Sequence, residues 1–299
     1  MPNFSDKVLS WFYVNGRHDL PWQKQPTPYR VWISEIMLQQ TQVVTVIPYF
    51  MRFINRFPTV AELAASDINH VLHLWTGLGY YARARNMHKA AQLIMKEYAG
   101  LFPTRLEDLE AMPGVGRSTA GAIAALSMNI RAPILDGNVK RVLTRYFAIS
   151  GWPEQTSVNN ELWKLAENLM PHDNIADYSQ AVMDLGATLC TRTHPSCPSC
   201  PLKVECEANK TDTTQDYPSR KPKKKLPVKT IFMFILQNDL DEVLLEKRPP
   251  NGIWGSLYSL PESESSTGLP PLSKLVVEGE RKALKLIRHT FSHYHLDIS

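Results

Sequence analysis

Four cysteines could hold a metal centre, because all the cysteines of the chain fall between positions 190 and 206: Cys190, Cys197, Cys200 and Cys206. Clustered thiolates bind either zinc or an iron–sulfur cluster. A structural zinc site usually has two Cys-x-x-Cys pairs, whereas here only Cys197 and Cys200 form one. The first residues show no secretory cleavage site, so we expect a cytoplasmic, reducing location in which clustered cysteines bind metal.

Two carboxyl groups in contrasting settings could together cleave a glycosidic bond. Glu35 lies in the apolar segment VWISEIML, where loss of water should raise its pKa and keep it protonated. Asp136 begins a predicted helix, whose N-terminus favours an ionised carboxylate. Sugar hydrolases use this pairing, with one group as general acid (here Glu35) and the other facing the developing cation. Taken alone, Glu35 could be a salt-bridged surface residue and Asp136 an ordinary N-cap.

A turn between two predicted helices, in residues 109–120, could bind a phosphate. Gly114 and Gly116 in the sequence PGVG let the backbone turn tightly and approach a ligand closely. The amides that begin the second helix then form an anion site. This pattern resembles the helix–hairpin–helix motif, which binds DNA phosphate without reading base sequence. A plain turn between helices is the alternative.

The overall composition is that of a soluble globular protein, with 43% hydrophobic and 21% charged residues. The 299 residues exceed the usual size of one hydrophobic core, so two domains are expected. A net charge of +4 permits a nucleic-acid partner without requiring one. No apolar run approaches the roughly 18 residues of a membrane span, so we expect no membrane partner.

Helical periodicity dominates the chain as far as the cysteines. Apolar residues recur at three- and four-residue spacing, and Pro and Gly separate these stretches. Short links between many helices leave no room for a sizeable sheet, so residues 1–211 predict an all-α domain. The predicted helices contain residues 8–13, 31–38, 43–53, 87–98, 120–126, 139–147, 162–170 and 176–189.

The pattern changes after position 211. Residues 212–229 are polar, then basic, with several prolines, and predict an exposed linker. The basic run 220–225 could be a nuclear localisation signal. The simpler interpretation is a solvated segment beside DNA phosphates. The chain stops at Ser299 in mid-pattern, so we expect the domain at 230–299 to be incomplete. That domain is predicted to be small and α+β, with strands at 231–236, 243–246 and 293–298 and a helix at 280–285.

The hairpin and the cysteine loop resemble those of the endonuclease-III-like glycosylase superfamily. Within it, the segments LPW, SEIMLQQTQV and GLGYYARARN closely resemble the MutY family of adenine DNA glycosylases, and the likeness runs over essentially the whole chain. The resemblance implies a [4Fe–4S] cluster on the four cysteines. It also implies that Glu35 protonates adenine and that Asp136 stabilises an oxocarbenium-like state, which water attacks directly or after a covalent adduct.

The same resemblance implies how the duplex is opened and read. Gln40 and Tyr80 match residues that wedge into the duplex and so offset part of the cost of extruding a base. The alternative for Tyr80 is a core aromatic. Adenine recognition in relatives maps onto Trp22, Gln23 and Gln180, although Gln23 stands where the family often has Arg.

Three further positions concern the sugar. Bifunctional members of the superfamily carry a Schiff-base Lys in the second helix of the hairpin, where this chain has Ser118. Since Ser cannot form an imine, we expect an enzyme that leaves the DNA backbone intact. Asn138 and Ser118 are expected to line the catalytic pocket or hold its water. Lys140 lies one helical turn from Asp136, where it could trap the sugar adventitiously or simply contact a phosphate.

The second domain resembles the Nudix fold. Its segment GIWGSLYSLP matches a Nudix signature, but the REx2EE box that would hold Mg²⁺ is missing, so we expect recognition rather than hydrolysis. The segment FSHYHL matches the loop that senses 8-oxoguanine in the family, with Ser292 and His293 as the contacts. The alternative is that His293 and His295 are alternating polar residues of a strand.

Together these features predict a monofunctional adenine glycosylase of base-excision repair. Its substrate would be double-stranded DNA in which adenine is mispaired with 8-oxoguanine or guanine. We expect a monomer in the bacterial cytoplasm, associated with the nucleoid. Ser118 and the FSH loop disfavour a thymine- or pyrimidine-damage glycosylase with lyase activity. The paired Glu35 and Asp136 disfavour a non-catalytic DNA-binding or Nudix-type regulatory protein.

Overall fold

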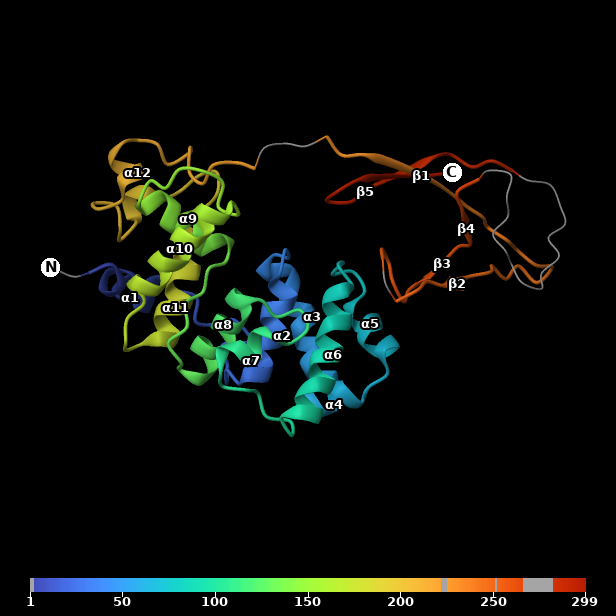
Figure 1. Ribbon diagram of the computed structural model, residues 1–299, viewed down its shortest axis with the longest axis horizontal. Helices are drawn as coiled ribbons and strands as arrows, with labels where there is room; N and C mark the ends of the chain where they lie inside the picture. Colours follow the sequence, from blue (N-terminus) through green and yellow to red (C-terminus); the bar gives the residue numbers. More distant parts are fainter. Residues whose placement is uncertain (1–2, 222–224, 251, 266–281) are drawn as a thin grey trace. The chain divides into compact units, whose positions relative to one another are not determined.

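The computed structural model describes residues 3–221, 225–250, 252–265 and 282–299. The chain divides into two compact units, Met1–Lys221 and Pro222–Ser299 (Figure 1). Every helix among the described residues lies in the first unit, and every described strand lies in the second. The prediction of an all-α domain followed by a smaller domain containing a sheet is therefore confirmed.

The first unit is built from short helices joined by tight connections. The helical stretches predicted in this unit lie in helices, although residues 98, 147 and 170 fall one position past an end, whereas α4, α5, α7 and α12 were not predicted. No described helix is long and apolar enough to cross a membrane. The elements are α1 (Phe4–Asn15), α2 (Pro28–Leu38), α3 (Val43–Arg56), α4 (Val60–Ala65), α5 (Ile68–Trp75), α6 (Ala82–Glu97), α7 (Leu106–Glu110), α8 (Arg117–Met128), α9 (Gly137–Tyr146), α10 (Thr156–Leu169), α11 (Ile175–Asp184), a π-helical turn (Leu185–Leu189), a 3₁₀ turn (Cys197–Ser199) and α12 (Glu207–Lys210).

Helix α2 is the central element for the site. It begins at Pro28, whose fixed φ suits the first helical position, and Thr27 caps it by accepting a hydrogen bond from the Arg30 amide. Most of its apolar residues are buried, and Trp32, Ile33 and Met37 are completely inaccessible to solvent. A helix enclosed in this way holds its backbone firmly, and it packs directly against α8.

Helix α8 brings the hairpin close to the segment that carries Asp136. Most of its buried side chains are alanines, which leave little bulk between neighbouring elements. A Cβ at Gly121 would collide with the carbonyl oxygen of Pro133, so only glycine lets residues 132–135 cross the helix here. Helix α11 packs on both α8 and α9.

The second unit contains a four-stranded sheet in the order β4-β1-β6-β5 and a separate pair, β2-β3. In the larger sheet, β1 runs parallel to β6 with Val228 opposite His295, while β5 and β6 form an antiparallel hairpin. The strands are β1 (Val228–Met233), β2 (Glu246–Lys247), β3 (Tyr258–Ser259), β4 (Glu262–Ser263), β5 (Ile287–Thr290) and β6 (His295–Ile298).

Several predicted boundaries in this region are wrong. The predicted strand at 243–246 is reduced to Glu246 at the start of β2 and a bridge from Val243 to Gln237. Of the predicted helix at 280–285, positions 280 and 281 lie outside the described residues, and positions 282–285 are not helical. Residues 231–233 and 295–298 of the other two predicted strands do lie in strands, β1 and β6.

The predicted linker at 212–229 is too long at both ends. Strand β1 already begins at Val228, and residues 212–221 belong to the first unit. The buried Arg145 guanidinium holds this stretch, because its Nε donates to the carbonyls of Thr214 and Tyr217 at 2.9 and 3.0 Å. Two backbone carbonyls of residues 212–221 are therefore bound by Arg145, which the polar composition of this stretch does not reveal.

Candidate active site and cysteine loop

Glu35 is the acid in a mostly apolar helix. Its neighbours Trp32, Ile36 and Met37 are buried, and within the described part of the chain no hydrogen bond reaches its carboxyl group. Loss of water therefore raises the pKa of Glu35 to about 8, with the nearby charge of Asp136 adding to the effect. A carboxyl with this raised pKa stays protonated at neutral pH, as the apolar surroundings predict. The reading of Glu35 as a salt-bridged surface residue is wrong, since no ion pair reaches it in the described chain.

Asp136 is the N-cap of α9. Its carboxylate accepts hydrogen bonds from the amides of Asn138 and Val139, at 3.0 and 2.8 Å, and from Asn138 Nδ2 at 2.8 Å. These donors favour the ionised form, as the helix N-terminus predicts, but burial outweighs them and the pKa of Asp136 is raised. No such donor reaches Glu35 among the described residues, so Glu35 is the carboxyl that stays protonated near neutrality.

Ser118 joins the hairpin to this carboxylate. Its Oγ accepts a hydrogen bond from the Leu135 amide at 3.1 Å, one residue before Asp136. In the turn itself, Gly114 has a φ of +80°, which favours glycine, and a Cβ there would lie 3.0 Å from Asn86 Cβ. Gly116 is the N-cap of α8, and no described heavy atom lies within 4 Å of a Cβ built on it, so its surface is open to a ligand.

A chain of polar contacts runs from Asp136 to the first cysteine. Asn138 donates to Asp136 and accepts from Arg141 Nη2 at 2.9 Å, while Arg141 Nε donates to the Cys190 carbonyl at 2.6 Å. Gly186 in the π-helical turn makes room for this contact, since a Cβ there would lie 2.7 Å from Asn138 Cβ. Lys140 points its ammonium to Glu154, at 3.5 Å.

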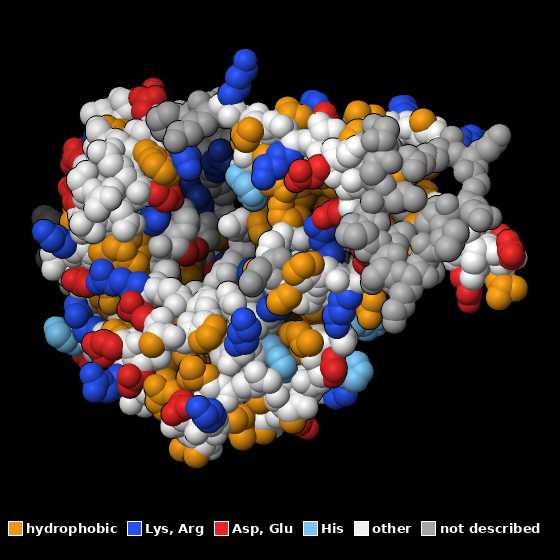
Figure 2. Space-filling model, turned by 45° about the vertical axis from the view of Figure 1, so that its right-hand side comes forward, with side chains coloured by type: hydrophobic (Ala, Val, Ile, Leu, Met, Phe, Trp, Pro, Cys, Tyr) orange, Lys and Arg blue, Asp and Glu red, His pale blue; other side chains and the backbone are white. Residues whose placement is uncertain are grey.

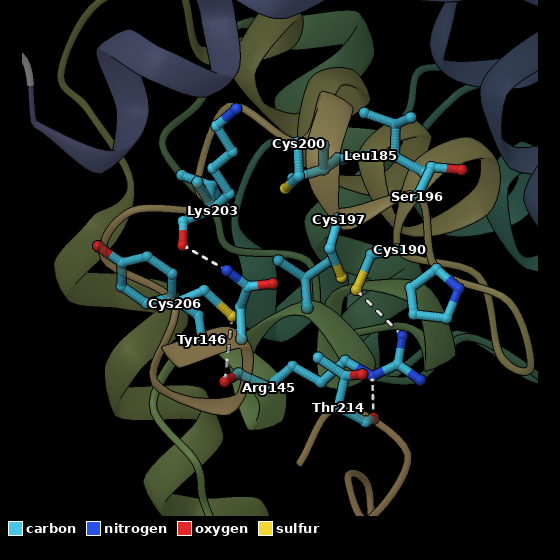
Figure 3. A pocket seen from close by; sticks show the side chains of 15 residues that line it. Arg145, Tyr146, Leu185, Cys190, Ser196, Cys197, Cys200, Lys203, Cys206 and Thr214 are labelled. Atoms are coloured by element: carbon cyan, nitrogen blue, oxygen red, sulfur yellow. Dashed lines mark hydrogen bonds between the residues drawn. The ribbon is translucent and has the colours of Figure 1, made fainter. Parts of the chain in front are cut away.

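The four cysteines line one hollow together with Arg145 (Figure 3). All four are free and half-buried, and Arg145 Nη1 donates to Cys190 Sγ at 3.3 Å. Burial raises the pKa of the Cys200 thiol to about 11, so that this thiol stays protonated at neutral pH unless a metal replaces its proton. The loop therefore offers a closely spaced set of thiols with one cationic donor beside them.

Comparisons with known proteins show which family this chain belongs to. The family model described as "HhH-GPD superfamily base excision DNA repair protein" matches residues 33–168, and a "NUDIX domain" model matches residues 232–299. An adenine DNA glycosylase of Buchnera aphidicola is 43% identical over 299 residues, covering 99% of this chain and 85% of the relative. This chain belongs to the adenine DNA glycosylases. It is a DNA N-glycosylase of base excision repair.

Other known proteins match a smaller part of this chain. The human adenine DNA glycosylase is 42% identical over 214 residues, which are 69% of this chain and 39% of the human protein. A thermostable thymine-DNA glycosylase is 27% identical, with a TM-score of 0.64 over 70% of this chain and 95% of that one. An endonuclease III in a DNA complex shares the fold at 23% identity and a TM-score of 0.59, over 70% and 94% of the two chains.

Of the three residues predicted to recognise adenine, Gln23 and Gln180 are connected through Arg17 and Asp184. Trp22 is buried, with its ring edge-on to Phe50 at 5.5 Å. Gln23 Nε2 donates to the Arg17 carbonyl at 2.9 Å, and Gln180 Nε2 donates to Asp184 Oδ1 at 2.9 Å. The sequence reasoning missed the ion pair that links the two amides, which joins Arg17 to the fully buried Asp184. The available signal in the sequence was Asp184 itself, an acidic residue flanked by the apolar Met183 and Leu185.

The two predicted wedge residues lie at exposed turns. Gln40 follows α2 and Tyr80 precedes α6, and both have positive φ values, +58° and +50°. The Tyr80 side chain is 54% exposed, so the alternative that it is a core aromatic is wrong. Arg83, which contacts both turns, was not among the predicted site residues.

Ser292 and His293 lie in the turn between β5 and β6, within the second unit. The turn is closed by a hydrogen bond from the Phe291 amide to the Tyr294 carbonyl at 2.9 Å, and both side chains are exposed. His293 is therefore not an alternating strand residue, whereas His295 does lie in β6. The ring of Trp254, from the predicted Nudix signature, lies 5.4 Å from that of Phe291.

Proposed function

We propose that this enzyme hydrolyses the N-glycosidic bond of adenine mispaired with 8-oxoguanine or guanine in double-stranded DNA. The observation that carries the proposal is the pair formed by Glu35 and Asp136: no described residue donates a hydrogen bond to the first carboxyl, and three donors hold the second. Such a pair supplies an acid and an anion at the same pH, which is what departure of a base from a sugar requires.

In this mechanism Glu35 gives its proton to the extruded adenine. The bond between the sugar C1′ and the base nitrogen breaks, and its electron pair leaves with the base, which the proton neutralises. Positive charge then develops on the sugar, where the Asp136 carboxylate stabilises it. A water molecule adds to C1′, directly or after a transient bond to Asp136, and its proton restores the Glu35 carboxyl.

We infer that the enzyme is monofunctional. An amine at position 118 would be needed for the imine that leads to strand cleavage, and Ser118 instead accepts a hydrogen bond from the Leu135 amide. The other candidate, Lys140, is paired with Glu154. The product would therefore be an abasic site in an unbroken strand.

The cofactor that these thiols fit best is a [4Fe–4S] cluster held by Cys190, Cys197, Cys200 and Cys206. All four thiols line one hollow, and only Cys197 and Cys200 form a Cys-x-x-Cys pair, whereas a structural zinc site usually has two such pairs. A zinc ion needs all its sulfur ligands about 2.3 Å away, whereas a cluster fills a wider hollow. When bound, the cluster supplies four iron–thiolate bonds that fix the loop between α11 and α12. Arg145 would offset thiolate charge at Cys190.

Replacing Cys200 with Ser is expected to remove the visible iron–sulfur absorbance and most of the bound iron. The reason is that a hydroxyl is a far poorer iron ligand than a thiolate. Ser199→Ala, in the adjacent 3₁₀ turn, is the matched control and should retain both. Iron and sulfide at the parental level in Cys200→Ser, or zinc in place of iron in the parent, would contradict the cluster assignment.

DNA would be held at defined sites on the enzyme. On the face drawn in Figure 2, Lys and Arg side chains lie interspersed with Asp and Glu. The open Gly116 at the start of α8 offers backbone amides to a phosphate, which suits the helix–hairpin–helix prediction. In the second unit, the exposed Ser292 and His293 are suited to contact the base opposite adenine. We expect a monomer acting in the bacterial cytoplasm.

The test is a base-release assay on duplexes that carry one adenine opposite 8-oxoguanine, guanine or thymine, each developed with and without alkali. Breaks that appear only after alkali, for the 8-oxoguanine and guanine partners but not for thymine, are expected. Breaks without alkali would contradict the monofunctional assignment. No base release by iron-loaded enzyme from either mispair would contradict the proposed substrate.

A further inference from the structure

The turn after α2 and the turn before α6 each hold a residue in an unfavourable backbone conformation. Gln40 and Tyr80 both lie in the left-handed region, which residues other than glycine rarely adopt. Such conformations persist only where the surroundings fix them. Both side chains are exposed, so the contacts that fix the two turns must be made by other residues.

The Arg83 guanidinium provides this fixation for both turns. Nη1 donates to three carbonyls at the end of α2, and Nη2 donates to the second turn and to a hydroxyl of the first. These carbonyls lack partners within their own helix, and the C-terminal end of a helix favours a cation. The acceptors are the carbonyls of Ile36 (2.9 Å), Met37 (2.9 Å), Gln39 (2.5 Å), Leu78 (3.2 Å) and Gly79 (3.3 Å), and Thr41 Oγ1 (3.3 Å).

The same guanidinium also contacts two aromatic rings. Its central carbon lies 5.4 Å from the centre of the buried Trp75 ring and 5.6 Å from that of Tyr80. Trp75 is itself fixed, since its Nε1 donates to the Gly79 carbonyl at 3.1 Å. Arg83 thus links a rigid ring of the core to the exposed ring of Tyr80.

We propose that Arg83 is a positioning residue that sets the separation and orientation of Gln40 and Tyr80 for extrusion of adenine. The inference rests on the proposed function, because it takes these two residues as wedges. Two wedges on a preorganised support enter the duplex without first having to be ordered, so more of the binding free energy remains for unstacking the base. Without Arg83 the two turns would vary independently.

Lysine cannot replace this arrangement. An ammonium group retains the charge but lacks the planar fork that reaches acceptors on two turns and stacks against rings. Arg83→Lys should therefore alter the wedges while changing little else. A residue with a purely structural role would instead lower activity equally for every substrate, because it would reduce the fraction of folded enzyme.

The experiment measures single-turnover adenine release from two duplexes. In one, adenine is stacked in a mispair with 8-oxoguanine. In the other, the same mispair is flanked by mismatches that already unstack it. Arg83→Lys is expected to slow release from the stacked target by roughly 10- to 100-fold, as misplaced groups commonly do. On the unstacked target its rate should come within about threefold of the parent. Fluorescence of 2-aminopurine beside the target should show the same loss of extrusion.

Arg52→Lys is the matched control, because Arg52 is exposed on α3 and stacks only on Tyr49 among the described rings. It should match the parent on both duplexes. Equal losses by Arg83→Lys on both targets, or no loss on either, would overturn the inference. If the parent releases adenine from neither duplex, the proposed function itself fails, which is a separate outcome.

A second variant covers the case in which Arg83→Lys does not fold. Thr41→Val removes one acceptor of the guanidinium and leaves Arg83 in place. It should slow release from the stacked target by a few-fold and leave the unstacked target unaffected. Equal rates for Thr41→Val and the parent on the stacked target would also count against the inference.

Discussion

Replacing Glu35 with Gln is expected to slow adenine release by ~10²–10⁴-fold, the usual range for a lost general acid. Gln keeps the shape and hydrogen-bonding capacity of the protonated carboxyl, but it has no proton to give. DNA binding should therefore survive. The measurement is single-turnover release from an adenine–8-oxoguanine duplex with enzyme in excess, together with the Kd for the same duplex.

Two controls separate this effect from damage to the fold. Glu97→Gln, at an exposed position on α6, should release adenine at the parental rate. Stability should not fall in Glu35→Gln either. The folded pKa of Glu35, about 8, lies above its ordinary value, so between those values folding takes up a proton and stability declines as pH rises. Gln does not ionise, so the variant folds without taking up this proton. Release within threefold of the parent would exclude Glu35 as the acid.

Asp136→Asn is expected to lower the rate on the order of 10³-fold, as removal of electrostatic stabilisation at a developing charge commonly does. The substitution separates the two roles of this residue. Asn is as good an N-cap as Asp, so α9 and the hydrogen bonds from Asn138 and Val139 can be kept while the charge is lost. Single-turnover release, with melting temperature measured alongside, distinguishes the roles.

The chain offers a close control for that variant. Asp67 caps α5 by accepting a hydrogen bond from the Asn69 amide at 2.7 Å, and it has no place in the proposed mechanism. Asp67→Asn should change neither the rate nor the melting temperature appreciably. If Asp136→Asn behaved in the same way, Asp136 would be a helix cap and nothing more.

Features that depend on neighbours in sequence could be predicted. Glu35 stands among apolar residues in the sequence, so its raised pKa could be foreseen. The cap at Asp136 is likewise local, since its backbone donors lie two and three residues ahead. The opposing effect of burial on Asp136 was not visible, because burial depends on elements that are distant in the sequence.

Features that depend on distant residues were missed. The carbonyl groups at the end of α2 that accept hydrogen bonds from Arg83, such as that of Gln39, lie about forty-five positions before it in the chain. No pattern in the sequence connects them to Arg83. The pair of Arg17 and Asp184 is similarly non-local. The segment after position 211 was predicted to be free because of its polar composition, but its carbonyls bind Arg145. Amino-acid composition reports on side chains, so it could not predict contacts that are made by backbone carbonyls.

The most direct test of the two-carboxyl mechanism is the pH dependence of single-turnover adenine release. The protonated form of Glu35 is the active one, so the rate should be steady near neutrality and fall above about pH 8, by roughly tenfold per unit. It should also fall on the acid side, as Asp136 takes up a proton, and Glu35→Gln should lose the alkaline limb. A rate that rises through pH 8 would mean that Glu35 acts as a base, and would contradict the mechanism.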